Sequence, residues 1–490
     1  MSVQVKEESS RIIEQIKKYI PPMRRFFDLN ETLKDYAEGL YNFAVAEAHL
    51  RRQELVIDVI QGHFERIFGT DSFAALNFKL VPPLAFNIAD HHQVLNHPAL
   101  ISSNFAATCF EFLKPKSAPI VVISSADVPP NNFFSLGGFQ LGGKKVPIFS
   151  VGERELCSYY IPKRDFNFVA RTRKAGRFSE FNEAEQKFLA SEENRIRNLD
   201  FSNCQDYCDQ ISVLVKDSWP RLFKSEIRMN VPNLLYIPQE EVVRQMLIRM
   251  IGDKNIITSV LFDSELRETV INNFRGIVVA WRESEAKGTH FFWRKYPGQN
   301  RALRLFLEGG LLVPHDKRFK DLAVPLKPEV ILDLLSKKEI YPSLFTIFAV
   351  LNFYCGIKPL VGYGSVMYLD LLKKVWLETL VGTKYSDEIK NLELVDTTGF
   401  MAGLPLFFER QNGKLKTLYG YDIVFRGGMS AEYLEKVMSL KFRDLVVVGV
   451  AEMYEYYANK YINADDRIRP DISSDDLAEF VFGKGSLMNL

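Results

Sequence analysis

Three of the chain's seven histidines, His91, His92 and His97, fall within a stretch of seven residues. An imidazole can donate a hydrogen bond to a phosphate or carboxylate, and it can carry a proton near neutral pH. The cluster follows a short apolar run, residues 84–89, and precedes a helix predicted to begin near Pro98. Open α/β sheets bind ligands at such strand ends, so we predict that these histidines are catalytic. The alternative is that they cap the strand or pack against aromatic rings.

A carboxylate is expected beside the histidines. Residues 119–124 form a second short apolar run, typical of a buried strand, and Asp127 follows it. Asp90 follows the first run in the same way, so the two carboxylates should lie at one edge of a parallel sheet. We predict that Asp127 takes part in catalysis by orienting an amine. The residues predicted to bind substrate in these loops are Asp90, Gln93 and Asn131.

Histidines and carboxylates together can also hold a metal ion. A metal-dependent hydrolase that uses the His91, His92 and His97 cluster is therefore one alternative function. Because His91 and His92 are adjacent and would point apart, we expect no metal. The cysteines do not add a site, since Cys204 and Cys208 have a helical spacing but no second pair follows them.

A glycine-rich turn opens a predicted helix later in the chain, at residues 356–365. Gly362 and Gly364 leave backbone N–H groups free to hold an anion, and Ser365 is a good N-cap residue. We predict that these three residues and Tyr368 bind an anionic group of the substrate. A plain helix start is the alternative interpretation.

Length and composition limit the classes of protein to consider. The 490 residues carry 62 basic and 61 acidic side chains, and a hydrophobic content of 47% is typical of globular proteins. The near-neutral charge argues against nucleic acid as a partner, because phosphate neutralisation usually needs a basic excess. The five scattered cysteines and the polar first residues predict a cytoplasmic location without a signal peptide. The uncharged segment 340–357 is predicted to be a buried helix, so no membrane partner is expected.

The spacing of apolar runs predicts an α/β fold with a Rossmann-like parallel sheet core that is discontinuous in sequence. Helical segments flank this core at both ends. The predicted parts are an N-terminal helical segment over 1–75, the first part of the core over 76–150, an inserted α+β segment over 151–340, the second part of the core over 341–400 and a mostly helical C-terminal segment over 401–490.

Two further strand predictions concern the inserted and C-terminal segments. Residues 276–281 are predicted to form a strand, with 289–293 and 303–306 as antiparallel partners around a turn at Pro297. Another strand is predicted from Tyr421 onward, followed by helices.

Read together, the three loops resemble motifs of the family of cysteine-adding enzymes of bacillithiol biosynthesis. The family's Gly-Gln-Gln-x-x-Leu turn is matched by Asp90-His91-His92-Gln93-Val94-Leu95, in which both glutamines are replaced by histidines. Of its acidic Glu-Asp-His-Asp loop, only Asp127 is matched. Its Gly-Pro-Gly-Glu-x-x-Tyr-x-x-Gln-Leu-Lys helix start is similar to residues 362–373, which keep both glycines, the tyrosine, the leucine and the lysine.

The resemblance covers roughly residues 80–380. It implies a bacterial Rossmann-type enzyme related to nucleotidyl transferases, with ATP or ADP as cofactor. The leading hypothesis is a soluble ligase or group transferase acting on a small carboxylate or amine metabolite, with assembly into a homo-oligomer left open. A non-catalytic ligand-binding or scaffold protein on the same fold is the alternative from another class.

Overall fold

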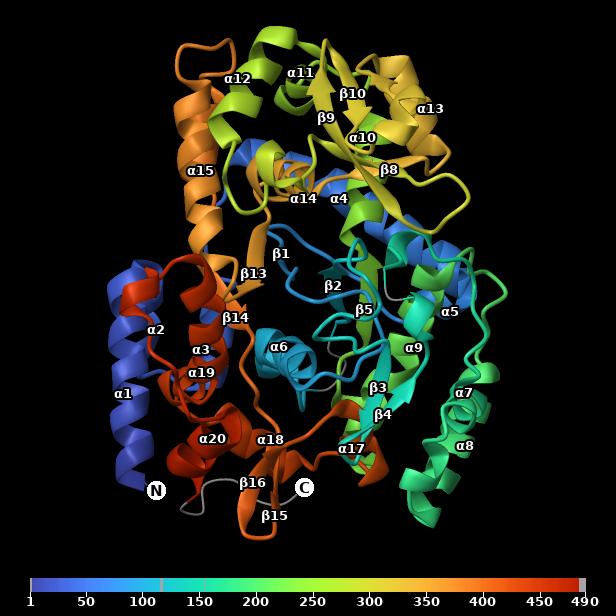
Figure 1. Ribbon diagram of the computed structural model, residues 1–490, viewed down its shortest axis with the longest axis vertical. Helices are drawn as coiled ribbons and strands as arrows, with labels where there is room; N and C mark the ends of the chain where they lie inside the picture. Colours follow the sequence, from blue (N-terminus) through green and yellow to red (C-terminus); the bar gives the residue numbers. More distant parts are fainter. Residues whose placement is uncertain (1, 115–117, 154, 484–490) are drawn as a thin grey trace.

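A parallel sheet of five strands lies near the centre of the protein in the computed structural model, which describes residues 2–114, 118–153 and 155–483 (Figure 1). Every pair of neighbouring strands is parallel. The first strand in the chain is the middle strand, and the chain moves outward from it twice, once in each direction. In spatial order the strands are β5 (Leu234–Pro238), β2 (Ile120–Ser124), β1 (Ala85–Asn87), β13 (Lys358–Gly362) and β14 (Gly399–Ala402).

Strands β2 and β5 are buried along their whole length. Their Ile-Val-Val-Ile and Leu-Leu-Tyr-Ile runs consist of branched and aromatic side chains, which suit a strand that is covered on both faces. Val122 pairs with Tyr236 on one side and with Asn87 of β1 on the other. Because all five strands run the same way, the loops that follow them meet at one edge of the sheet.

Helices that pack around this sheet bring the loop residues into place. All 11 residues of α6 (Pro98–Thr108), the helix that follows β1, are buried. Helix α9 (Tyr207–Ser218) packs on β5, and α10 (Gln239–Met250) begins directly after β5. Helix α4 (Glu47–Phe68) packs on α10, and α15 (Val366–Leu380) follows β13.

A second sheet, antiparallel throughout, occupies the upper part of the molecule together with α11 to α14 (Figure 1). The predicted antiparallel pairing around Pro297 is confirmed, with Trp293 opposite Arg304. The strands are β11 (Val324–Pro325), β10 (Leu311–Pro314), β9 (Ala302–Glu308), β8 (Phe292–Lys295) and β12 (Ile340–Pro342), and the helices are α11 (Ile256–Phe262), α12 (Ser264–Phe274), α13 (Pro328–Ser336) and α14 (Leu344–Phe348).

The strand predicted at 276–281 is wrong. The chain turns at Gly276, whose φ of 89° is left-handed, and Ala280 N–H donates to the Ile277 carbonyl at 3.1 Å. Only β6 (Trp281–Arg282) is extended, and it pairs with β7 (Lys287–Gly288). Ile277, Ala280 and Trp281 of this run are buried, whereas Val278 is exposed. Trp281 Nε1 donates to the Ile271 carbonyl of α12 at 3.0 Å, so the turn packs on that helix.

Helices from the two ends of the chain pack together at the lower left of Figure 1, where α1 contacts both α19 and α20. The strand predicted from Tyr421 onward is wrong, since α17 (Gly420–Phe425) is a helix that begins with a capping box formed by Tyr419 and Asp422. The other helices of this part are α1 (Ser2–Tyr19), α2 (Arg24–Asp28), α3 (Leu33–Gly39), α18 (Ala431–Met438), α19 (Phe442–Lys460) and α20 (Ser474–Phe482).

The uncharged segment 340–357 is buried inside the protein, as β12, α14 and a π-helical turn at Ala349–Tyr354. Within the described ranges, none of the helices combines the length and the apolar character that crossing a bilayer requires. The remaining elements are α5 (Thr70–Ala74), α7 (Phe168–Lys174), α8 (Glu183–Arg197), α16 (Glu388–Glu393) and the hairpins β3 (Gly138–Leu141) with β4 (Lys144–Pro147) and β15 (Phe408–Gln411) with β16 (Lys414–Thr417).

Candidate functional site

Asp90 lies just after β1, and its side chain is fully buried. Its carboxylate accepts hydrogen bonds from Ser103 Oγ at 2.9 Å, from Asn104 Nδ2 at 2.6 Å and from the Tyr236 hydroxyl. Burial raises the pKa of Asp90 to about 6. Because side chains of the protein occupy both oxygens, Asp90 connects the loop to α6 and β5 and presents no free oxygen to a substrate.

His91 extends the pairing of β1 with β2 beyond the strands, since it forms a parallel bridge with Ser125. Its Nδ1 lies 3.1 Å from Asn132 Oδ1, which also accepts the backbone N–H of Phe134. An amide oxygen can only accept, so Nδ1 carries the proton and Nε2 carries a lone pair. Burial lowers the pKa of His91 to about 4, which keeps the ring neutral at physiological pH. Its Nε2 is therefore available as a hydrogen-bond acceptor.

His92 and His97 serve the protein itself. His92 Nε2 donates to the Cys208 carbonyl at 2.8 Å, and His92 Nδ1 lies 2.8 Å from Ser124 Oγ. His97 is the N-cap of α6, and its Nδ1 accepts the N–H of Ala99 at 3.2 Å. Burial lowers the pKa of each ring to about 4. Neither imidazole is charged at neutral pH, so neither supplies a cation for a phosphate.

Gln93 and Asn131 also make contacts within the protein. The Gln93 side chain accepts from the Tyr207 hydroxyl at 2.9 Å and donates to the Ser158 hydroxyl. Asn131 Oδ1 lies 3.3 Å from Lys145 Nζ of the β3–β4 hairpin. Both side chains fix neighbouring loops in place around the end of β2.

The glycine loop after β13 packs against α19. Tyr457 donates to the Tyr363 carbonyl at 2.7 Å, and a Cβ placed on Gly364 would lie 2.9 Å from the Tyr456 hydroxyl oxygen. Ser365 N–H donates to the Gly362 carbonyl at 2.9 Å. The Ser365 hydroxyl bonds to that of Tyr368, whose pKa burial raises to about 12. Tyrosine hydroxyls therefore make the contacts between this loop and α19.

The loops lie along one edge of the sheet but start from different strands. Strand β1 separates β13 from β2, so the glycine loop and the Asp127 loop begin about 10 Å apart at ordinary strand spacing. The histidine loop lies between them and is joined to the Asp127 loop, because His92 N–H donates to the Ser125 carbonyl at 2.7 Å.

Asp127 pairs with a carboxylate that the sequence analysis did not identify, that of Glu240. Glu240 Oε2 accepts the N–H of Ala126 at 3.0 Å, Glu240 Oε1 accepts the N–H of Asp127 at 3.2 Å, and Asp127 Oδ1 accepts from the Ser125 hydroxyl at 2.8 Å. Burial raises the pKa of Asp127, and burial together with the Asp127 charge raises the pKa of Glu240 to about 8. At neutral pH Glu240 is therefore protonated, and it lies close enough to Asp127 for the charge of one carboxyl group to shift the pKa of the other.

The pKa of the next residue along the chain, Glu241, shifts in the opposite direction. Burial alone would raise its pKa, but the guanidinium of Arg244, 2.7 Å away, lowers the pKa of Glu241 well below the ordinary range. Tyr159 also donates to Glu241 at 2.7 Å. Adjacent carboxyl groups with opposed pKa shifts are typical of sites in which one group moves protons and the other holds the structure.

An apolar wall closes one side of the carboxyl pair. Cys157 and Tyr341 are both buried, and Cys157 Sγ lies 3.5 Å from the Tyr341 hydroxyl oxygen. Burial raises the pKa of Cys157 to about 12, so the thiol stays protonated and is not a nucleophile at neutral pH. The low polarity of this wall is what keeps the proton on the pair.

Glu240 had a signal in the sequence. The run Leu-Leu-Tyr-Ile before Pro238 is apolar and short, and Gln239-Glu240-Glu241 opens the helix that follows. A strand followed by an acidic residue and a helix is the same order that drew attention to Asp90. The predicted domain boundaries place this run in the inserted segment, outside the parallel sheet to which it belongs.

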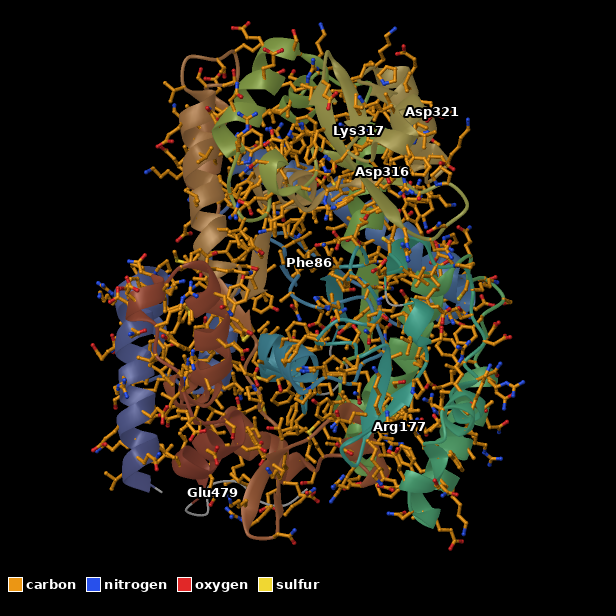
Figure 2. All side chains as sticks on the ribbon, viewed as in Figure 1. Phe86, Arg177, Asp316, Lys317, Asp321 and Glu479 are labelled. Atoms are coloured by element: carbon orange, nitrogen blue, oxygen red, sulfur yellow. The ribbon has the colours of Figure 1, made fainter. Side chains whose placement is uncertain are left out.

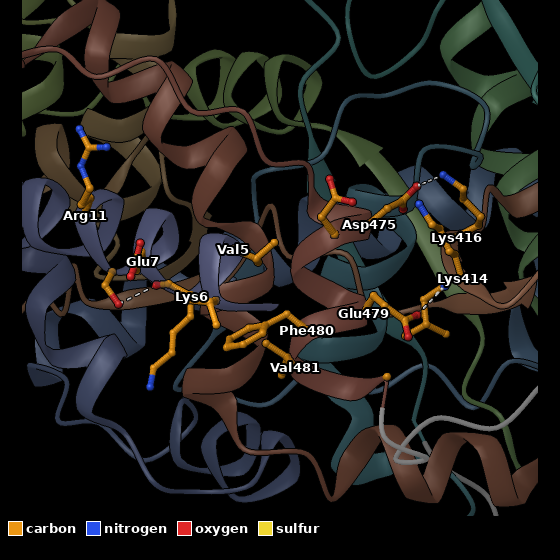
Figure 3. A pocket seen from close by; sticks show the side chains of 15 residues that line it. Val5, Lys6, Glu7, Arg11, Lys414, Lys416, Asp475, Glu479, Phe480 and Val481 are labelled. Atoms are coloured by element: carbon orange, nitrogen blue, oxygen red, sulfur yellow. Dashed lines mark hydrogen bonds and ion pairs between the residues drawn. The ribbon is translucent and has the colours of Figure 1, made fainter. Parts of the chain in front are cut away.

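A large cavity lies far from these loops. It has a volume of about 1140 Å³ between α1, β16 and α20, and Figure 3 shows its mixed lining of apolar and charged side chains. In Figure 2, Glu479 of this region lies at the lower end of the molecule, whereas Phe86 of β1 lies near the middle. Asp475 Oδ1 accepts the N–H of Thr417, and Glu479 Oε2 accepts that of Leu415, both at 3.0 Å. These carboxylates cap the outer edge of β16.

The chain was compared with protein-family models, with curated proteins and with solved structures, and none of the three comparisons finds a match.

Proposed function

We propose that the protein is a Rossmann-like enzyme that transfers an activated carboxyl group to an amine. The strand order supports this architecture, because the chain leaves the central strand β1 in both directions. In doubly wound sheets the gap between such strands is where a ligand binds, outside their carboxyl ends. Here that gap lies between the histidine loop after β1 and the glycine loop after β13.

The neighbouring carboxyl groups of Asp127 and Glu240 are the observation that carries the proposal, because Glu240 accepts the backbone N–H of Asp127 at 3.2 Å and its pKa is raised to about 8. An amine is a nucleophile only after it has lost a proton, and a base with a pKa near the working pH accepts that proton best. In the proposed step the amine nitrogen forms a bond to the carbonyl carbon, the bond from that carbon to its leaving group breaks, and the amine proton passes to the pair. Asp127 lies in a half-buried loop that a substrate can reach, and it passes the proton to Glu240, which is fully buried and has a pKa of about 8.

The other loop residues supply binding and position in this proposal. His91 Nε2 accepts a hydrogen bond from the substrate, and the hydroxyls at Ser365 and Tyr368 bind its polar end. ATP as the source of the leaving group is supported by the resemblance to cysteine-adding enzymes. His92, His97 and Asp90 hold the loops in place, because their polar atoms are engaged within the protein.

The metal-dependent hydrolase is less well supported. His92 uses both ring nitrogens and His97 uses Nδ1 for contacts within the protein. In the part of the chain that the structure describes, no group of three or more histidine, cysteine or acidic side chains is arranged to hold a metal ion.

Nucleotide and amine binding should first be tested by thermal shift. ATP, ADP and single amino acids at millimolar concentration are each added to the wild-type protein, since a ligand that binds the folded state raises Tm. Release of phosphate or pyrophosphate from ATP is then followed with mixtures of amines and carboxylates. Glu240→Gln should lower this rate by about 100-fold, the effect of removing a general base, while the exposed control Glu435→Gln leaves it unchanged.

The pH dependence separates catalysis from binding alone. The wild-type rate should rise with pH until the pair is deprotonated near pH 8, and this limb should disappear in Glu240→Gln. A Glu240→Gln variant with full activity, or a protein that none of these ligands stabilises, would refute the proposal. Full activity of Glu240→Gln would mean that another group is the base, whereas the absence of any stabilising ligand would favour a non-catalytic scaffold on the same fold.

A further inference from the structure

A second polar cavity lies in the antiparallel-sheet part of the molecule, away from the parallel sheet. Its volume is about 480 Å³, and its lining comes from the end of α12, from β9 and from the loop residues Glu283, His290 and His315. Its polar lining residues are Glu268, Asn272, Arg275, Glu283, His290, Glu308 and His315. None of them belongs to the proposed catalytic site, so any ligand of this cavity would bind independently of the proposed reaction.

His290 forms the buried floor of this cavity. Only 3% of its side chain is exposed, and its ring lies between the rings of Trp281 and Phe306, with centroids 4.8 and 5.2 Å away. His290 Nδ1 accepts the N–H of Leu307 at 2.8 Å. Since Nδ1 is an acceptor, Nε2 carries the proton in the neutral ring.

That Nε2 proton has no hydrogen-bond acceptor within the protein. Glu283 Oε1 is 3.3 Å away, but it lies in a direction that does not give a hydrogen bond with the Nε2 proton, and both Glu283 oxygens accept from Arg275 at 3.1 to 3.2 Å. A buried donor without an acceptor costs about 1–3 kcal/mol, and native proteins rarely keep one without a use. A ligand oxygen in the cavity would satisfy the His290 donor.

The charged residues around the cavity indicate which charge the ligand carries. Glu268, Glu283 and Glu308 supply three carboxylates, and Arg275 supplies one guanidinium that is already paired with Glu283. Burial lowers the pKa of His290 to about 4, so its ring adds no positive charge at neutral pH. The cavity is therefore net negative and favours a cation.

We propose that this cavity binds a small organic cation, an aliphatic amine that carries a hydroxyl or ether oxygen. The oxygen accepts from His290 Nε2, and the ammonium group lies between the exposed carboxylates of Glu268 and Glu308. Phe306, whose ring contacts both His290 and His315, forms an apolar side of the cavity for the carbon skeleton.

A pair of probes that differ in one group tests this site. 6-Amino-6-deoxyglucose carries an ammonium group and ring hydroxyls, whereas glucose offers the same hydroxyls without the charge. Binding is measured by calorimetry at neutral pH and low salt on the full chain. In parallel, the ring-nitrogen resonances are followed in protein labelled with ¹⁵N-histidine, and a His290→Gln variant assigns the His290 signal.

The amino sugar should bind and shift the His290 Nε2 resonance, and glucose should do neither. Glu308→Gln and Glu268→Gln change exposed side chains, so both variants should fold, and each should weaken binding about two- to fivefold. The distant Glu435→Gln should bind as the wild type does, and so should Glu240→Gln, which separates this site from the proposed catalytic one. An unmoved His290 resonance, or equal affinity in all variants, would mean that His290 and Glu283 form a structural pair only and would overturn the proposal.

Discussion

Acidification should destabilise the protein because its buried histidines are neutral in the folded state but take up protons in the unfolded chain. In six of the seven, His49, His63, His91, His92, His97 and His290, burial lowers the pKa to about 4. The unfolded chain then binds more protons than the folded chain between about pH 6.5 and pH 4. The stability that these histidines contribute is fully present above pH 6.5 and is lost as the pH falls toward 4.

His92 allows the effect to be measured at one position. Its side chain is fully buried and both ring nitrogens are hydrogen bonded. With an unfolded pKa of about 6.5 and a folded pKa of about 4, proton linkage predicts a loss of about 2 kcal/mol between pH 7.5 and pH 5. His92→Gln keeps an amide that can donate to the Cys208 carbonyl but cannot titrate. The variant is expected to be less stable than the wild type at pH 7.5, with the gap shrinking by about 2 kcal/mol at pH 5.

Urea unfolding followed by circular dichroism at a series of pH values measures this gap. His315→Gln is the matched control, because it makes the same substitution at an exposed histidine. Parallel curves for wild type and His92→Gln, or a His92 resonance that titrates near pH 6.5, would refute the reasoning.

Two further variants test the glycine loop and the carboxyl pair. Gly403→Ala places a Cβ 2.4 Å from the Tyr363 ring at a φ of 97°, and we expect a loss of about 1–3 kcal/mol in urea unfolding. Gly382→Ala, at a φ of 74° with open space around it, should cost only about 1 kcal/mol, so an equal loss would show that the contact with Tyr363 is unimportant. The folded pKa of Glu240 lies above its unfolded value, so stability falls as pH rises toward 8, and Glu240→Gln should gain about 2 kcal/mol relative to wild type between pH 6 and pH 9. A constant difference over that range would contradict the raised pKa of Glu240.

Local patterns predicted the central elements well. The run at 119–124 is confirmed as β2, and the helix expected near Pro98 begins there as α6 with His97 as its cap. These predictions succeed because buried runs and caps depend on neighbouring residues. Strands β5 and β14 were missed because their place in the sheet depends on pairing with strands far away in the chain. A short apolar run does not show which partner it will find.

The sites were harder to predict for a similar reason. The histidine cluster lies where the loops after β1 and β2 meet, and the polar atoms of His92 and His97 contact Cys208 and the start of α6. Their spacing in the sequence is the same whether such atoms contact the protein or a ligand. Glu240 completes the pair with Asp127 only because β2 and β5 are neighbours, and that contact spans more than 100 residues of chain. A pKa shift depends on such contacts and on burial, which spacing alone does not describe.

The capping of β16 by Asp475 and Glu479 gives α20 a protective role during synthesis. The β15–β16 hairpin leaves the ribosome well before α20 does, so the N–H groups of Leu415 and Thr417 face outward until that helix folds. An open strand edge is a template for pairing with another chain. Molecules that have lost α20 would keep this edge open and be the first to join through their hairpins, so the helix acts as an internal safeguard against self-association.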